Sequence, residues 1–260
     1  MDSSEAKDLS AIVDLRKIEV VKKPIEDSHG LPNECYTSEA YTKIERKKLF
    51  EDQWAVIGIA SSVPNIGDAK PFNLLGIPII ILRDKKNKIR VFHNVCSHRG
   101  YKLLNKSCKI KNVIRCPYHS WSYNTLGKLV ATPHIGGMNK HNLDKFDKSK
   151  SGLKEIKSKV WLDLIFVNIN DNQISFEEYI KPLSDRWEKF WPKKDRELIV
   201  YSKDFGYFNL NAKCNWKFAI ENYCESYHLP FVHPGLNSYS KIGDHYHILG
   251  SHNRFAGQGT

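Results

Sequence analysis

The stretch that decides the fold is Cys96-Ser-His98-Arg-Gly100, followed after a connecting segment by Cys116-Pro-Tyr-His119-Ser-Trp121. Each segment supplies one thiolate and one imidazole, and seventeen residues separate His98 from Cys116. Structural zinc sites usually pair Cys with Cys and His with His, at spacings of about two to five residues. Mixed Cys–His pairs suit two metal ions better, with both cysteines on one ion and both histidines on the other. The pattern therefore favours a dinuclear iron–sulfur site, and a zinc site is the alternative.

The residues around these ligands support the same interpretation. Gly100 would relieve the backbone of the first loop, and Pro117 would stiffen the second loop. Cys108 lies on the connecting segment and matches no ligand position, so we interpret it as structural. With these flanks the motif resembles the Rieske family, and the resemblance implies four ligands for a [2Fe–2S] cluster: Cys96, His98, Cys116 and His119.

The residues next to the four ligands indicate which branch of the Rieske family the motif resembles. Respiratory-complex Rieske proteins resemble this motif but carry two additional cysteines, which form a disulfide beside the cluster. The matching positions here are Tyr101 and Tyr118. The resemblance is therefore to the ferredoxin and oxygenase branch of the family.

A second group of metal-binding residue types lies about 100 residues farther along the chain. On a helix predicted over Asn215–Tyr227, residues 221, 225 and 228 would share one face. His233 would leave that face, but Pro230 should disturb the helix and let its end turn His233 back toward His228. Two imidazoles and one carboxylate are the ligand set of non-heme iron(II) oxygenases. Taken alone, such a helix is usually a solvated face, and the upstream motif favours the metal site.

The order and separation of the two motifs are similar to those of Rieske-type non-heme iron oxygenase α subunits, in the ring-hydroxylating oxygenase superfamily. The resemblance covers about residues 35–250. It implies that His228 and His233 bind the mononuclear Fe(2+). It also implies that Glu225 is an electron-transfer bridge, placed between an iron histidine and a cluster histidine of the neighbouring subunit. Many members have Asp there, and Glu225 resembles the branch that acts on choline, carnitine or betaine.

The resemblance implies a terminal oxygenase that takes electrons from a ferredoxin or flavin reductase. With O2 it would hydroxylate or demethylate a small organic substrate, and a head-to-tail homotrimer is implied for the full-length protein. The family supplies a third iron ligand, an Asp, much farther along, whereas the only acid after His233 is Asp244. We therefore expect a truncated product that binds mononuclear iron weakly and is inactive alone. A Rieske electron-transfer protein and a degenerate, non-catalytic homologue are the alternatives.

The fold class expected is α+β, with an antiparallel β Rieske domain followed by the start of an α+β helix-grip catalytic domain. Short β-type runs separated by turn signals indicate an antiparallel sandwich or barrel. They are Trp54–Ala60, Ile77–Arg83, Ile89–Asn94, Val113–Arg115, Trp121–Tyr123 and Val160–Ile169. The turn signals include Asp84–Lys88. A helix is predicted after a cap at Thr37 or Ser38, and another after the capping box Ser175–Glu178. Further strands are predicted at Tyr207–Ala212 and Tyr246–Leu249.

These elements divide the chain into four parts. We predict an N-terminal arm over residues 1–36, the Rieske domain over 37–170, a helical connection and linker over 171–196 and an incomplete catalytic domain over 197–260. Within the third part, residues 192–196 are predicted as the linker.

The positive charge of the chain is concentrated in one block. The sequence holds 40 Lys+Arg and 29 Asp+Glu, a net charge of +11. Residues 83–115 hold eleven bases and one acid, Asp84, which is a net charge of +10. No nucleic-acid-binding motif accompanies this block, and it coincides with the metal loops, so we predict no nucleic-acid partner. A solvated surface and a docking face for an acidic electron donor are the two interpretations.

Composition excludes several other classes. With 41% hydrophobic and 27% charged residues, the chain is typical of a globular protein. Its apolar runs are much shorter than the roughly 20 residues of a membrane span. The N-terminus shows no secretory signal, so we expect a cytoplasmic, reducing location in which the six cysteines form no disulfide framework. No glycine-rich nucleotide fingerprint is present, so NADH would be used by the reductase.

Overall fold

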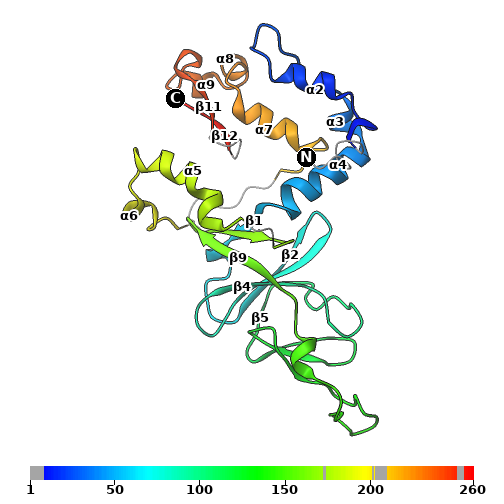
Figure 1. The fold of residues 1–260 in the computed structure, drawn as a ribbon. Helices are drawn as coiled ribbons and strands as arrows, with labels where there is room; N and C mark the ends of the chain where they lie inside the picture. The colour runs from blue at the N-terminus through cyan, green and yellow to red at the C-terminus, as the bar shows by residue number, and fades with distance from the viewer. Residues whose placement is uncertain (1–8, 172–173, 201, 203–209, 251–254) are drawn as a thin grey trace. The chain divides into compact units, whose positions relative to one another are not determined.

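The computed structural model describes residues 9–171, 174–200, 202, 210–250 and 255–260, and the chain divides into two compact units (Figure 1). The first, called here the β unit, comprises Lys48–Phe176 and Trp191–Phe205. The second, called the helical unit, comprises Met1–Lys47, Glu177–Phe190 and Gly206–Thr260. Each unit is described by itself below.

The β unit is built on a seven-stranded sheet with the order β1-β10-β9-β4-β3-β2-β5 in the described residues. All neighbouring strands are antiparallel. The strands are β1 (Trp54–Ile59), β2 (Asp68–Leu74), β3 (Ile77–Arg83), β4 (Ile89–His93), β5 (Cys108–Lys109), β9 (Glu155–Trp161) and β10 (Leu164–Asn168). A three-stranded sheet adds β6 (Val113–Arg115), β7 (Ser122–Asn124) and β8 (Leu129–Ala131). The short helix α6 (Lys193–Arg196) also belongs to this unit.

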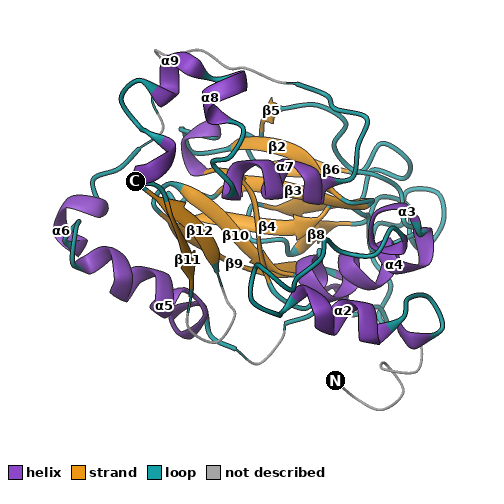
Figure 2. Ribbon diagram, turned by 90° about the horizontal axis from the view of Figure 1, so that it is seen from above, coloured by secondary structure: helices purple, strands orange, loops and turns teal. Residues whose placement is uncertain are grey.

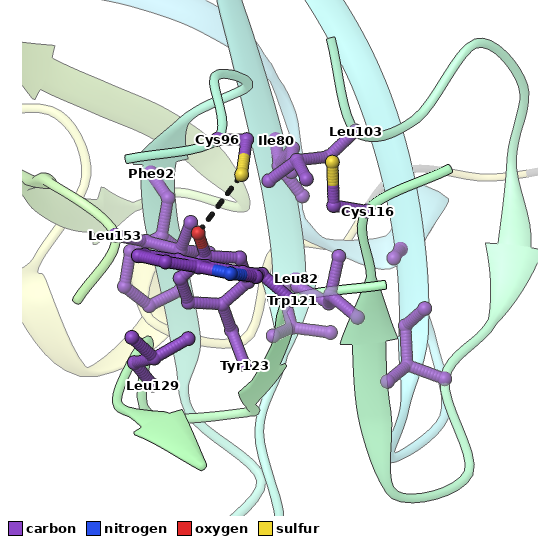
Figure 3. Close-up of a cluster of buried hydrophobic side chains, with 13 residues drawn as sticks. Ile80, Leu82, Phe92, Cys96, Leu103, Cys116, Trp121, Tyr123, Leu129 and Leu153 are labelled. Carbon is purple, nitrogen blue, oxygen red and sulfur yellow. Dashed lines mark hydrogen bonds between the residues drawn. The ribbon is translucent and has the colours of Figure 1, made fainter. Parts of the chain in front are cut away.

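Strand β3 explains why the sheet is buried on both faces. Its side chains alternate, so Ile80 and Leu82 enter one hydrophobic cluster while Ile79 and Ile81 enter another. The first cluster also holds Cys96 and Cys116, with both sulfurs lying at its edge near Trp121 (Figure 3). Burial of these aliphatic side chains therefore supports the two metal loops directly.

The turn between β3 and β4 uses the one acid of the basic block. Asp84 is fully buried and accepts the backbone N–H groups of Lys86 and Lys88 and the Nε–H of Arg90. Burial raises the pKa of Asp84, but these hydrogen bonds outweigh it and hold the pKa below its usual value. The turn predicted at residues 84–88 is thus confirmed, and the role of Asp84 is to stabilise this turn.

The helical unit contains most of the helices and a hairpin (Figure 2). Its elements are α2 (Leu15–Val21), α3 (Glu34–Thr37), α4 (Glu39–Glu45), α5 (Phe176–Glu188), α7 (Trp216–Cys224), α8 (Leu229–Val232), α9 (Pro234–Asn237), β11 (Tyr246–Leu249) and β12 (Ala256–Gly259). Ser38 caps α4 by accepting the N–H of Tyr41, as its sequence predicts. Helix α5 continues through Pro182. No helix in the described part of the chain is long and apolar enough to cross a membrane.

Contacts within the helical unit join α3 and α4 to α7. Lys217 and Glu45 form a buried ion pair, with Nζ 2.8 Å from both carboxylate oxygens. Tyr36 stacks on Phe218, with ring centroids 4.7 Å apart, and its hydroxyl donates to Glu221 over 2.7 Å. Together the burial of Tyr36 and its bond to Glu221 raise the pKa of the phenol to about 12. These contacts hold α7 against the N-terminal segment.

The α+β class and the antiparallel sheet are confirmed, but three element predictions are wrong in detail. Residues 160–169 form parts of two strands, β9 and β10, because the chain reverses at Leu162 and Asp163, which both have positive φ. The helix predicted over Asn215–Tyr227 ends at Cys224, where Glu225 is extended. The segment after Pro192 is helical, as α6.

The remaining predictions of strands and boundaries have mixed outcomes. The strand at Tyr246–Leu249 is confirmed as β11. The first half of the strand predicted at Tyr207–Ala212 lies outside the described residues, and its second half, residues 210–212, is not a strand. Residues 37–47, which the sequence placed with the Rieske domain, group with the helical unit. The predicted arm includes the helix α2, whose N-cap Asp14 accepts the N–H of Arg16.

Candidate metal centre

The two Cys–His loops share one backbone hydrogen-bond pattern. In the first, the Cys96 N–H donates to the Tyr101 carbonyl over 2.8 Å, and the Gly100 N–H donates to the Cys96 carbonyl over 2.9 Å. The second loop repeats both bonds: Cys116 N–H to Trp121 carbonyl at 2.8 Å, and Ser120 N–H to Cys116 carbonyl at 3.0 Å. Each loop therefore closes into the same five-residue turn, with its cysteine at the start.

The fourth residue after each cysteine is left-handed. Gly100 has φ +69°, and Ser120 has φ +58° at the equivalent position. Glycine adopts this conformation without penalty, whereas a residue with Cβ is strained there. The glycine at position 100 indicated an unusual backbone conformation in the sequence, whereas the serine at position 120 did not.

The loops bring like ligands together. Both cysteines are buried and free of disulfides. Burial raises the pKa of the Cys116 thiol, and the neighbouring Cys96 thiol raises it further. The two imidazoles lie side by side, with ring centroids 4.7 Å apart. Two thiols on one side and two imidazoles on the other is the division that a dinuclear cluster requires.

The imidazoles are held in different environments. His98 is exposed and stacks on Trp121, with centroids 4.5 Å apart and ring planes 10° from parallel. Desolvation, the neighbouring His119 and Arg99 all lower the pKa of His98. The Nδ1 atom of His119 is buried and has no hydrogen-bond partner among the residues that the structure describes. A buried nitrogen without a partner is costly unless another atom, such as a metal ion, engages it.

Tyr123 supplies a hydrogen bond to the ligand sulfur. Its hydroxyl lies 3.0 Å from Cys96 Sγ and accepts the Ser97 N–H over 3.2 Å (Figure 3). Ser97 Oγ also lies 3.0 Å from this hydroxyl, but it donates its own proton to the Ser151 carbonyl over 2.6 Å. The Tyr123 proton therefore has two acceptors in reach, Ser97 Oγ and the Cys96 sulfur. Burial and the Cys96 thiol both raise the pKa of Tyr123, so the phenol stays protonated.

Asn94, to which the sequence assigned no role, anchors the first loop. It is fully buried directly after β4, and its amide donates to the Leu104 carbonyl over 2.7 Å. Its carbonyl oxygen accepts the N–H groups of Leu103 and Leu104 at 3.1 and 2.8 Å. Leu103 leads out of the first loop, so Asn94 fixes both ends of that loop. An amide residue that directly follows an apolar strand, two residues before a cysteine of the motif, was the available signal.

The second motif is arranged by two short elements. Glu225 caps the turn after α7 by accepting the N–H groups of Tyr227 and His228, and its other oxygen contacts His228 Nδ1. Burial opposes ionisation of Glu225, but these bonds hold the pKa of its carboxyl below the usual value. His228 and His233 stand at the two ends of α8, with ring centroids 5.3 Å apart.

This geometry differs from the continuous helix expected from the sequence, but it still brings His233 near His228. Glu225 and His228 are not on one helix face with Glu221, because α7 ends at Cys224. Pro230 lies in the first turn of α8, where a missing N–H costs nothing, and one helical turn brings His233 near His228. No three His, Cys, Asp or Glu side chains in the described residues gather so that they could hold one metal ion. The second motif there presents its two histidines without a third ligand.

Comparison with known families assigns both motifs. Residues 53–146 match the family model of the Rieske [2Fe-2S] domain, and residues 201–260 match that of the ring hydroxylating alpha subunit catalytic domain. Over these two segments the chain is similar to the Rieske oxygenase α subunits. The paired thiols, the paired imidazoles and the unpartnered His119 Nδ1 fit the [2Fe–2S] cluster of the first domain.

Curated relatives agree with the assignment. The chain is 30% identical over 217 residues to the carnitine monooxygenase oxygenase subunit of Acinetobacter pittii, covering 83% of this chain and 56% of that protein. It is 28% identical over 208 residues to the glycine betaine monooxygenase oxygenase subunit of Chromohalobacter salexigens, covering 80% and 44%. The chain thus spans about half the length of the curated relatives it matches.

Solved structures give the same result. A quaternary ammonium Rieske monooxygenase in complex with L-carnitine matches with a TM-score of 0.73 and 27% identity, over 89% of this chain and 62% of that chain. A naphthalene 1,2-dioxygenase from Rhodococcus matches with a TM-score of 0.65 at 22% identity, a level that supports the fold alone.

Proposed function

We propose that this chain is part of a terminal oxygenase component, which oxidises a small organic substrate with O2 through hydroxylation or demethylation. The observation that carries the proposal is the pairing of thiols with thiols and imidazoles with imidazoles in two loops of one backbone pattern. The Glu225–His228 contact beside His233 supports a second, mononuclear iron site.

Six residues would hold the metals. Cys96 and Cys116 would bind one iron of the cluster, and His98 and His119 the other. His228 and His233 would bind the mononuclear iron. When bound, the cluster supplies one-electron transfer and the mononuclear Fe(II) supplies activation of dioxygen.

The protein's own groups prepare these sites. The contact of His228 Nδ1 with Glu225 places the imidazole proton at Nδ1, so Nε2 is the nitrogen available to a metal. The carboxylate is itself fixed by two backbone N–H groups. Its side chain remains 41% exposed, which leaves room for a further donor. That room supports the proposed role of Glu225 as a bridge to a cluster histidine of a neighbouring subunit.

The substrate and the partners are inferred from the relatives and from the family resemblance. Several curated relatives are named for carnitine or glycine betaine, which supports a quaternary ammonium substrate. A ferredoxin or flavin reductase would supply the electrons. A homotrimer would bring the bridge of one subunit to the cluster of the next, and sedimentation of the purified protein measures that assembly. A cytoplasmic location stays a prediction from the sequence.

Metal analysis tests the proposal. We expect two irons and two sulfides per chain, a brown protein, and the EPR signal of a reduced Rieske cluster. Cys116→Ser should abolish all three, whereas Cys108→Ser, which changes a cysteine outside the ligand set, should leave them intact. A colourless protein that contains zinc would refute the iron–sulfur assignment.

An electron-transfer protein is the second candidate. The observation that favours it is the two-histidine mononuclear site within the described residues. If the protein carries only electrons, its cluster should reduce and reoxidise normally while Co(II), a spectroscopic substitute for Fe(II), binds no better to the parent than to His228→Ala. Tighter Co(II) binding by the parent favours the oxygenase.

A further inference from the structure

A loop of the β unit folds around two histidines that have no part in the proposed function. Residues 132–143, called here the histidine loop, follow β8 and precede a 3₁₀ helix at Lys148–Ser151. His134 and His141 are both exposed, and their ring centroids lie 4.9 Å apart. These twelve residues contain no helix or strand, so the shape of the loop depends on individual hydrogen bonds.

Each of the two imidazoles accepts a backbone N–H group at its Nδ1 atom. The His134 N–H donates to His141 Nδ1 over 3.1 Å, and the Asn139 N–H donates to His134 Nδ1 over 2.9 Å. An imidazole nitrogen accepts a hydrogen bond only while it carries no proton. Both bonds therefore require neutral imidazoles that carry their proton on Nε2.

These two bonds hold a backbone conformation that is unfavourable by itself. His134 and Asn139 both have φ +58°, which residues with a Cβ adopt at a cost. Contacts around them must offset that cost, and the two imidazole nitrogens supply two such contacts. His141 is fixed in turn, because its carbonyl accepts the Thr132 hydroxyl over 3.0 Å. The closed loop thus depends on both histidines.

The closed loop places an apolar side chain against the metal loops. Ile135, which directly follows His134, packs against the hydrophobic cluster that contains Cys96, Cys116 and Trp121. Phe146, just beyond the loop, contacts Trp121 edge-on, with ring centroids 5.5 Å apart. Opening of the loop would withdraw Ile135 from this cluster and give water access to the buried cysteines.

The surroundings of the two histidines offer their protonated forms no carboxylate partner. The loop borders two pockets, and the other charged or titratable groups in their linings are Arg115, Lys148, His98, Tyr118 and His119. Lys140 lies within the loop, and Asp144 and Lys145 are exposed just after it. Asp147 accepts the N–H and the hydroxyl of Ser149. Protonation of the histidines therefore adds positive charge beside cations, and opening the loop transfers that charge to water.

We propose that His134 and His141 are positioning residues, which hold the histidine loop closed over the metal loops at neutral pH and release it in acid. Protonation at Nδ1 below about pH 6 removes both acceptors, so the Ile135 contact is lost with them. The sign follows from proton binding: the open loop binds more protons than the closed loop, so acid favours the open loop. This inference goes beyond the proposed function, because it concerns the loop whether or not a substrate is oxidised.

The experiment compares three variants with the parent by hydrogen–deuterium exchange and mass spectrometry. In His134→Asn/His141→Asn, each amide oxygen can replace Nδ1 as an acceptor but does not titrate. His134→Ala/His141→Ala removes the acceptors at every pH. The matched control is His247→Asn, which changes an exposed histidine of β11 in the helical unit. Exchange of the peptide over residues 132–143 is measured between about pH 7.5 and about pH 5.5 and corrected for the intrinsic pH dependence of amide exchange.

We expect the protection of this peptide to fall about tenfold from the higher to the lower pH in the parent and in His247→Asn. The double Asn variant should stay protected throughout, and the double Ala variant should be unprotected throughout. Bleaching of the cluster absorbance at the lower pH should be slower in the double Asn variant than in the parent.

Constant protection in the parent would overturn the proposal, and so would an equal loss in the double Asn variant or a loss of the pH effect in His247→Asn. The exchange measurement requires no cluster. A parent protein that forms no cluster would therefore refute the proposed function, while the exchange data would still decide the role of the two histidines.

Discussion

At the scale of single residues, Tyr123 controls the electronic surroundings of one ligand sulfur. Its hydroxyl lies 3.0 Å from Cys96 Sγ, which can only accept a hydrogen bond once it is a metal-bound thiolate. A hydrogen bond to a sulfur stabilises the more negative, reduced cluster. Tyr123→Phe should therefore lower the reduction potential, and one lost bond of about 1 kcal/mol corresponds to roughly 40 mV for one electron.

A redox titration followed by circular dichroism measures this shift. Tyr41→Phe is the control, because it removes a phenol outside the metal loops. An unchanged potential in Tyr123→Phe would show that the hydroxyl serves packing alone.

A second prediction at this scale concerns the left-handed position shared by the two loops. Gly100→Ala places a Cβ where φ is +69°, although no atom lies within 4 Å of it. The cost is therefore conformational, about 1 kcal/mol. Ser120→Gly relieves the same strain at φ +58° in the other loop and should gain a similar amount. Denaturant unfolding of both variants checks the opposite signs, and a loss in both would contradict the equivalence of the loops.

At the scale of elements, α7 is held in place by a buried ion pair. Lys217 and Glu45 are about 10% exposed, and the Lys217 ammonium lies 5.2–5.5 Å from the rings of Tyr36, Tyr41 and Trp216. Lys217→Met leaves the Glu45 carboxylate buried without its partner, at a cost of about 3 kcal/mol. Urea unfolding measures this cost. The double variant Lys217→Met/Glu45→Gln should recover part of it, and a single-variant loss below about 0.5 kcal/mol would mean that water replaces the partner.

Some secondary-structure elements of this chain could be predicted from its sequence, and others could not. The strands β3 and β4 and the turn at Asp84 followed from local patterns, because each has a continuous β-type run and a strong turn signal. Strand β2 was not predicted, since Pro71 and Asn73 interrupt its pattern and its pairing with β3 decides the structure. The end of α7 was misplaced because Glu225 satisfies the following turn instead of another helical turn, and that choice depends on three-dimensional contacts.

The candidate site could likewise be predicted from the sequence only in part. Residue types and spacing predicted six metal ligands, because few chemistries need thiolates and imidazoles in that order. The roles of Tyr123 and Asn94 depend on which side chains meet in space, and their positions in the sequence gave no comparable pattern.

At the scale of the whole molecule, the two functional motifs belong to different compact units. The four predicted cluster ligands all lie in the β unit, whereas the Lys217–Glu45 pair and the two histidines proposed for the mononuclear iron lie in the helical unit. Removing the cluster should leave two buried thiols and the unpartnered His119 Nδ1, which destabilises the β unit only. We therefore expect two calorimetric transitions, and cluster removal by oxidation and chelation should lower only one of them.

Two variants assign the transitions independently. Cys116→Ser prevents cluster assembly and should lower the same transition as chelation does. Lys217→Met should lower the other transition, because its partners Glu45 and Tyr36 belong to the helical unit. A single transition that moves in every case would mean that the units unfold cooperatively, since independent units cannot share one melting temperature through both changes. The metal loops would then stabilise the whole chain and not the β unit alone.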